Sequence, residues 1–143
     1  MQLFEALDVL TQELGQLRRK AAASSPEDFA RIYLSHHFTL PPSRMHDELF
    51  ELVHEATKKR AQRIAVAAPR GHANSTVVSL AYVLWSVLYK HESFVWLVSA
   101  TREQAEQQLR HVRDELEANP RLLSDFPEVC AGKRPKPWRA GKI

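Results

Sequence analysis

The chain has 143 residues, of which 44% are hydrophobic and 26% charged, which indicates one folded domain with a buried core and excludes a disordered chain. The net charge of +3 comes from the end of the chain, since residues 131–143 hold five basic and no acidic side chains, against fifteen basic and seventeen acidic ones in residues 1–130. The single Cys130 excludes an intrachain disulfide framework, and no apolar run reaches the about 20 residues that cross a bilayer, so we expect a cytoplasmic protein without a membrane partner.

Residues 1–60 are predicted to form a helical N-terminal region. Leucines spaced alternately by four and three residues predict a helix over residues 2–22 with one apolar stripe. We expect this stripe either to pack on the chain's own domain or to form a short coiled-coil or partner-binding seam. Ser25 and Pro26 predict the N-cap and first position of a second helix that reaches His37, and helical periodicity returns over residues 43–59.

The pattern changes after residue 60. Two short apolar runs, residues 64–68 and 94–98, are typical of buried parallel strands. The apolar stretch 75–90 between them predicts a buried helix, and an amphipathic helix follows from Thr101, with a Thr101 and Gln104 capping box, to a stop at Asn119. The predicted fold class is therefore α/β, with a β-loop-α-β unit after the helical region.

The segment 68–76 lies between the first predicted strand and its helix, where a phosphate-binding loop is expected. Such a loop needs small residues whose N–H groups surround a phosphate, a lysine for the terminal phosphates and a Ser or Thr hydroxyl for Mg²⁺. Against the pattern G-x-x-x-x-G-K-[ST], only Ser75 agrees, because Ala68 and Ala73 replace glycines and Asn74 replaces the lysine. The residues alone leave open an ordinary turn with Ser75 as N-cap.

A wider string resembles a known family. AAPRGHANST, the apolar helix after it, FVWLVSAT and REQAEQQLRHVRDELEANPRLLSDFPEVC together resemble the N-terminal ATPase region of phage terminase large subunits, the motors that pump DNA into procapsids. The resemblance covers roughly residues 28–143 and implies an incomplete P-loop NTPase-type βαβα unit with parallel strands over residues 61–125, followed by an irregular basic tail over 126–143. It also implies ATP and Mg²⁺ as cofactors, and double-stranded DNA, the small terminase subunit and the portal as partners in a bacterial host cell.

The same resemblance assigns roles to the loop residues. Arg70 corresponds to the loop arginine that acts on the γ-phosphate or senses the nucleotide state, and is the predicted catalytic residue. Ser75 becomes the Mg²⁺ ligand. The remaining nucleotide-binding residues of the loop are the backbone cradle, the residue at the lysine position and the neighbour of Ser75: Gly71, His72, Ala73, Asn74 and Thr76.

Family members also hold adenine with a segment upstream of the loop, and HHFTLPPSRMH resembles that segment. Phe38, Pro41 and His46 are the predicted ring contacts. The alternative is a helix-packing turn, with His36 and His37 at the edge of the core. A metal site made of His36, His37 and His46 is disfavoured, because neither a cysteine nor a convincing ligand spacing supports it.

Asn74 predicts ATP binding with impaired hydrolysis, because a neutral amide cannot neutralise the charge that develops on the phosphates. The chain also has no acidic strand to order Mg²⁺ and no nuclease region, so the resemblance implies a truncated part of a larger motor. Two parallel strands alone form a poor sheet, which predicts cover by the N-terminal helices, self-association or a partner. The alternative function is a non-enzymatic, terminase-derived module that binds a packaging partner or DNA.

The basic tail provides the predicted DNA contacts. Cations hold phosphates and an aromatic ring among them stacks on a base. Solvated disorder of the tail is the competing interpretation. The predicted DNA-binding residues are Lys133, Arg134, Lys136, Trp138 and Arg139.

Overall fold

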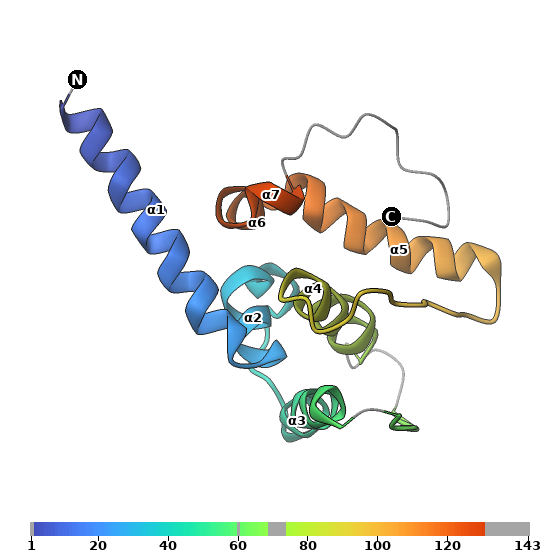
Figure 1. Ribbon diagram of the computed structural model, residues 1–143. Helices are drawn as coiled ribbons and strands as arrows, with labels where there is room; N and C mark the ends of the chain where they lie inside the picture. Colours follow the sequence, from blue (N-terminus) through green and yellow to red (C-terminus); the bar gives the residue numbers. More distant parts are fainter. Residues whose placement is uncertain (1, 60, 69–73, 131–143) are drawn as a thin grey trace.

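The computed structural model describes residues 2–59, 61–68 and 74–130, and all regular structure in these ranges is helical (Figure 1). The predicted α/β class is therefore wrong for the described residues, which contain no strand and no parallel-strand βαβα unit. In chain order, the elements are α1 (Gln2–Ala23), α2 (Pro26–Tyr33), the 3₁₀ turn η1 (Ser35–His37), α3 (Arg44–Lys58), the π-helical η2 (Thr76–Ala81), α4 (Tyr82–Leu88), α5 (Arg102–Ala118), α6 (Pro120–Asp125) and α7 (Pro127–Cys130).

The two runs predicted as strands are non-helical but have no ladder partner in the described part of the chain. Residues 94–98 keep the alternation of a strand, because Phe94, Trp96 and Val98 are 63%, 79% and 82% exposed while Val95 and Leu97 pack against the core. A β-branched, aromatic run favours a strand only where a neighbouring strand accepts its N–H and C=O groups. The prediction of two buried parallel strands is therefore wrong in pairing and in burial, since Ile64 and Val66 in the first run are also 42% and 49% exposed.

The predicted helix boundaries are confirmed where a capping side chain fixes them. Ser25 Oγ accepts from the Asp28 N–H at 3.0 Å with Pro26 in the first turn, and Thr101 Oγ1 accepts from the Gln104 N–H at 3.3 Å. α5 ends before Asn119 as predicted. Two boundaries differ: the second helix stops at Tyr33 before η1, and residues 127–130, predicted to be irregular, form α7.

The core lies where α2 and α4 meet. In Figure 1, α5, α6 and α7 cover one side of this pair and α3 covers the opposite side. The largest buried side chains come from α2, from α4 and from the residue after α6: Phe29, Tyr33, Trp85 and Phe126 are each no more than 1% exposed. Aromatic side chains from distant segments thus meet in the core and stabilise the packing of these helices.

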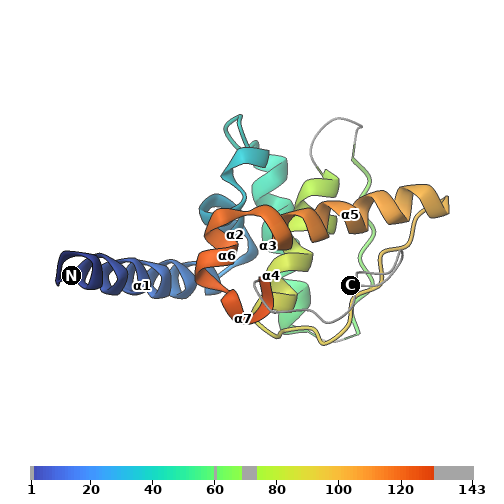
Figure 2. The ribbon, with the colours of Figure 1, turned by 90° about the horizontal axis from the view of Figure 1, so that it is seen from above.

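Helix α1 packs on this core only through its C-terminal half, and its N-terminal half projects away (Figures 1 and 2). Within α1 only Gly15 and Ala22 are buried. The predicted packing of the leucine stripe on the chain's own domain is therefore wrong, since all five leucines are at least 50% exposed: Leu3, Leu7, Leu10, Leu14 and Leu17.

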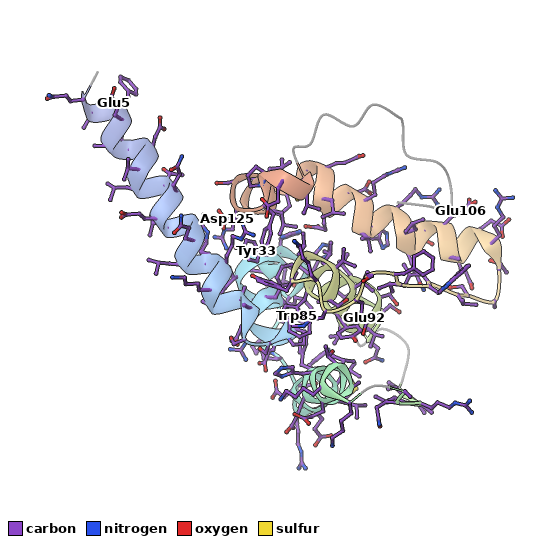
Figure 3. The ribbon with its side chains drawn as sticks, in the orientation of Figure 1. Glu5, Tyr33, Trp85, Glu92, Glu106 and Asp125 are labelled. Carbon is purple, nitrogen blue, oxygen red and sulfur yellow. The ribbon has the colours of Figure 1, made fainter. Side chains whose placement is uncertain are left out.

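A buried carboxylate joins α1, α2 and α6 (Figure 3). The Asp125 side chain is 0% exposed and accepts hydrogen bonds from Arg18 Nε at 2.7 Å, Arg18 Nη2 at 2.6 Å and the Tyr33 hydroxyl at 2.8 Å. Burial alone would raise the pKa of Asp125, but these bonds outweigh it and hold the pKa below its usual value. Gly15 lets the helices approach here, because a Cβ at this position would lie 2.8 Å from Asp125 Oδ1.

Among the described residues, no helix is both long and apolar enough to cross a membrane. The longest, α1, has 22 residues but carries charged side chains along its length, including Glu5, Asp8 and Lys20.

Candidate functional site

The predicted phosphate loop is described only at its two ends. Arg70, Gly71, His72 and Ala73 lie outside the described residues, so the catalytic and cradle roles expected for them stay predictions. Helical backbone begins at Asn74 and continues through η2 into α4. The described residues thus contain the helix that is expected after a phosphate-binding loop but not the strand that is expected before it.

The first turns of this helix have two unusual features. The backbone of Ser75 is already helical, and its exposed side chain makes no capping hydrogen bond, so the alternative with Ser75 as N-cap is not what the structure has. Next, the Tyr82 N–H donates to the Val77 carbonyl five residues earlier, as in a π-helix, a form that is frequent at functional sites. Asn74 and Thr76 are half-buried on either side of Ser75.

The residues predicted to contact adenine have other contacts in the structure. The ring of Phe38 lies 6.0 Å from that of Phe50 and packs against the core. Nδ1 of His46 accepts from the Ser43 N–H at 3.1 Å and closes the capping box at the start of α3. Pro41 is exposed. The adenine contacts expected for these three residues therefore stay predictions.

The predicted DNA contacts are all outside the described residues: Lys133, Arg134, Lys136, Trp138 and Arg139. The last residue that the structure describes is Cys130, at the end of α7. The basic tail therefore stays a prediction from charge and composition alone.

An apolar cavity of about 910 Å³ opens between α4, the extended segment 93–97 and α5. Its walls include the exposed rings of Phe94 and Trp96. Its polar lining includes Arg102 and Glu106, and Arg102 Nε donates a hydrogen bond of 2.7 Å to Glu106 Oε1 (Figure 3). A space of this kind accepts an apolar group but supplies little chemistry. Sequence patterns do not reveal it, because its lining comes from separate elements: α4, residues 93–97, α5 and α7.

The structure also brings together three side chains that were not grouped from the sequence. His36 and His37 on η1 each place Nε2 next to the same oxygen of Glu115 on α5, at 2.8 Å and 2.7 Å from Oε1. The ligand atoms of the three residues lie within 4.8 Å of one another. Glu115 is 78 residues after His37 in the chain, so only tertiary packing makes this cluster.

Glu115 is held from its other side by Asn119. Asn119 Nδ2 donates to Glu115 Oε2 at 2.7 Å and also to the Tyr33 carbonyl at 2.8 Å, while its Oδ1 accepts from the Arg121 and Leu122 N–H groups. Burial favours a raised pKa for Glu115, but the bonds from Asn119, His36 and His37 hold that pKa below its usual value. The carboxylate is therefore ionised, oriented and aimed at two imidazoles.

One sequence signal for Glu115 existed. On the amphipathic helix α5, Glu115 lies beside Val112 and Leu116, the apolar residues that face the core, and it is buried with them. An acidic residue on the buried face of a helix needs partners, which marks it as a residue with a role. One partner, Asn119, lies four residues later in the sequence, whereas the two histidines lie on η1, 79 and 78 residues earlier.

Comparison with known proteins does not assign this chain to a family. The chain matches no model of a protein family, no curated protein and no solved structure. Its function is therefore inferred from its own residues.

Proposed function

We propose that this chain is the nucleotide-binding N-terminal part of a phage terminase large subunit, an ATP-driven DNA-packaging motor that acts in the cytoplasm of a bacterial host. The observation that carries the proposal is the string AAPRGHANST leading directly into a helix that is buried against the core. Double-stranded DNA, the small terminase subunit and the portal are the partners that this function entails. The proposal rests on the loop and its helix, and not on a sheet, since the described residues contain no strand.

The start of this helix is suited to an anion. Val77 and Ala81 are 0% exposed, so the helix is fixed against the core and its first N–H groups have a defined direction. Such N–H groups and the positive end of the helix dipole favour a phosphate. The exposed hydroxyl of Ser75 would be the protein ligand of Mg²⁺, which when bound supplies positive charge to the phosphate oxygens.

Asn74 fits binding better than turnover. Its side chain can donate a hydrogen bond to a phosphate oxygen but carries no charge, whereas phosphoryl transfer builds charge on the β- and γ-phosphates. Losing one such electrostatic contact costs about 10²-fold or more in rate. We therefore propose a chain that binds ATP with Mg²⁺ and hydrolyses it poorly or not at all.

The test is nucleotide-dependent stability in the presence of Mg²⁺. ATP at 100 times its Kd stabilises a folded state by about 2.7 kcal/mol, which raises Tm by several degrees for a chain of this size. Asn74→Lys should bind ATP more tightly than the original chain, and Ser75→Ala should bind more weakly. Gln107→Lys, on the exposed part of α5, is the matched control because it adds the same charge elsewhere. The nucleotide proposal is wrong if ATP shifts Tm in neither the original chain nor Asn74→Lys.

A second candidate is favoured by α1. Its exposed leucine stripe, spaced like the seam of a coiled coil, is an apolar surface with no cover in the described residues. We propose as the alternative function a non-enzymatic module that binds another helix, from a second copy or a packaging partner, through this stripe. This function requires no nucleotide.

Sedimentation tests the α1 alternative. If the stripe forms a seam between two copies, Leu10→Glu combined with Leu14→Glu should convert a dimer to a monomer, because two charges would be buried in the seam. Gln12→Glu with Gln16→Glu adds the same charge to the same helix and should leave the dimer intact. A monomer at all concentrations for the original chain would refute self-association.

Deleting residues 131–143 separately tests the DNA prediction, since the affinity for DNA and its salt dependence should both fall.

A further inference from the structure

We infer that His36, His37 and Glu115 form a binding site for one divalent transition-metal ion of the Zn²⁺ type. The site is separate from the phosphate loop and does not depend on the proposed nucleotide function. The three residues supply two imidazole nitrogens and one carboxylate oxygen, which is a ligand set that Zn²⁺ prefers. This cluster differs from the disfavoured site of three histidines because its third ligand is Glu115 and not His46.

The geometry is close to what a metal requires. The two Nε2 atoms lie 2.8 Å and 2.7 Å from Glu115 Oε1. Zn–N and Zn–O bonds of about 2.0–2.1 Å in a tetrahedral site place ligand atoms about 3.3 Å apart, so each imidazole must move outward by roughly 0.6 Å. The histidines stand on a single 3₁₀ turn, and their side chains are 54% and 34% exposed, so this adjustment meets little packing resistance.

The carboxylate is already fixed in the way that metal ligands usually are. Asn119 donates from Nδ2 to Glu115 Oε2, the oxygen that the imidazoles do not contact, and is itself anchored on the Tyr33 carbonyl. Outer partners of this kind orient a ligand and are a regular part of metal sites. The Glu115 side chain is 11% exposed, so its negative charge is largely removed from water, and the two imidazoles are its ion-pair partners in the described residues.

Charge and access complete the argument. At present the buried carboxylate faces two imidazoles, which carry charge only when they are protonated. A divalent cation between the three side chains would place a permanent +2 charge beside this carboxylate. The exposed imidazoles leave the outer side open to solvent, so water can fill the remaining position, as it does in three-ligand zinc sites. Bound metal would also clamp η1 to α5 and raise the stability of the fold.

The experiment titrates Zn²⁺ into the metal-free full chain by isothermal calorimetry, with Co²⁺ absorption as a second measurement. We expect one Zn²⁺ per chain, a Tm raised by several degrees, and visible Co²⁺ bands of a four-coordinate site. Glu115→Gln and the double variant His36→Gln/His37→Gln should each weaken Zn²⁺ binding at least about tenfold and abolish the Co²⁺ bands. His46→Gln and Cys130→Ser should retain both, which excludes incidental binding by another imidazole or by the thiol.

The variants are chosen so that folding does not obscure the result. Glu115→Gln keeps the shape of the side chain and its capacity to bond Asn119, and the two histidines are on an exposed turn, so at least one variant should keep the helical circular dichroism of the original chain. Either folded variant decides the question. The site is refuted if the original chain takes up no Zn²⁺, or if a folded variant lacking the carboxylate or both imidazoles binds Zn²⁺ as tightly as the original chain.

Discussion

Replacing Asp125 by alanine removes the carboxylate that ties α1 and α2 to α6. Three hydrogen bonds reach this side chain, two from Arg18 and one from the Tyr33 hydroxyl. The Arg18 side chain is 32% exposed, so water can partly replace its lost partner, and the ion-pair share is about 1.5 kcal/mol, at the low end for charged hydrogen bonds. Tyr33 is 1% exposed, and leaving its hydroxyl without a partner costs about 1–2 kcal/mol more.

The expected loss for Asp125→Ala is therefore about 3 kcal/mol in the free energy of unfolding, as for other broken buried pairs. Urea denaturation followed by circular dichroism measures it. Asp114→Ala is the matched control, because the Asp114 side chain is 64% exposed and its Oδ1 lies 3.9 Å from Arg113 Nε, at the outer limit of an ion pair. This variant should change the free energy of unfolding by less than about 0.5 kcal/mol. Equal, small losses for both variants would refute the reasoning that burial gives Asp125 its importance.

The same carboxylate sets a pH dependence with a definite sign. The folded pKa of Asp125 is below the 3.8 of the unfolded chain, so its contribution is fully present above that value and is lost as pH falls through the folded pKa. The stability difference between the original chain and Asp125→Asn should therefore shrink between about pH 5 and pH 2. A difference that stays constant over this range would show that the carboxylate charge is not what matters.

Three further outcomes follow from contacts elsewhere. Gly15→Ala should lower the free energy of unfolding by about 1–3 kcal/mol, although alanine favours helices, because its Cβ would lie 2.8 Å from the fixed Asp125 Oδ1; a higher Tm in calorimetry would contradict this. Asn119→Ala should cost about 2–3 kcal/mol, since its amide caps α6 and holds both Glu115 and the Tyr33 carbonyl, and a loss under 1 kcal/mol would argue against it. Trp96→Ser should leave stability within about 0.5 kcal/mol but reduce the fluorescence of an apolar dye bound in the cavity, because the Trp96 ring is 79% exposed there; unchanged dye binding would exclude that cavity as the dye site.

Local sequence rules predicted the helices well. Capping by Ser25 and Thr101 and the stop at Asn119 depend on side chains within a few residues of the helix end, so they hold whatever the rest of the chain does. The burial of most side chains between Val77 and Leu88 was also predictable, because a helix that is apolar on nearly all sides has no stable place in water. Helix ends and the burial of this apolar helix therefore follow from local sequence.

Pairing, docking and the metal cluster were decided by tertiary structure. A strand exists only when a second segment accepts its hydrogen bonds, so residues 94–98 kept the alternation of a strand without becoming one. An amphipathic stripe says that a helix has an apolar side, but not which surface covers it, so the α1 leucines could be exposed.

Glu115 illustrates the same limit at the level of one side chain. The sequence placed it on an amphipathic helix and gave two histidines far upstream, and nothing local connects them. Contact between η1 and α5 brings the three together. By itself the sequence determined the longer helices and the caps at Ser25 and Thr101; only the tertiary structure decided which distant groups meet, because such contacts depend on how helices pack and not on residue spacing.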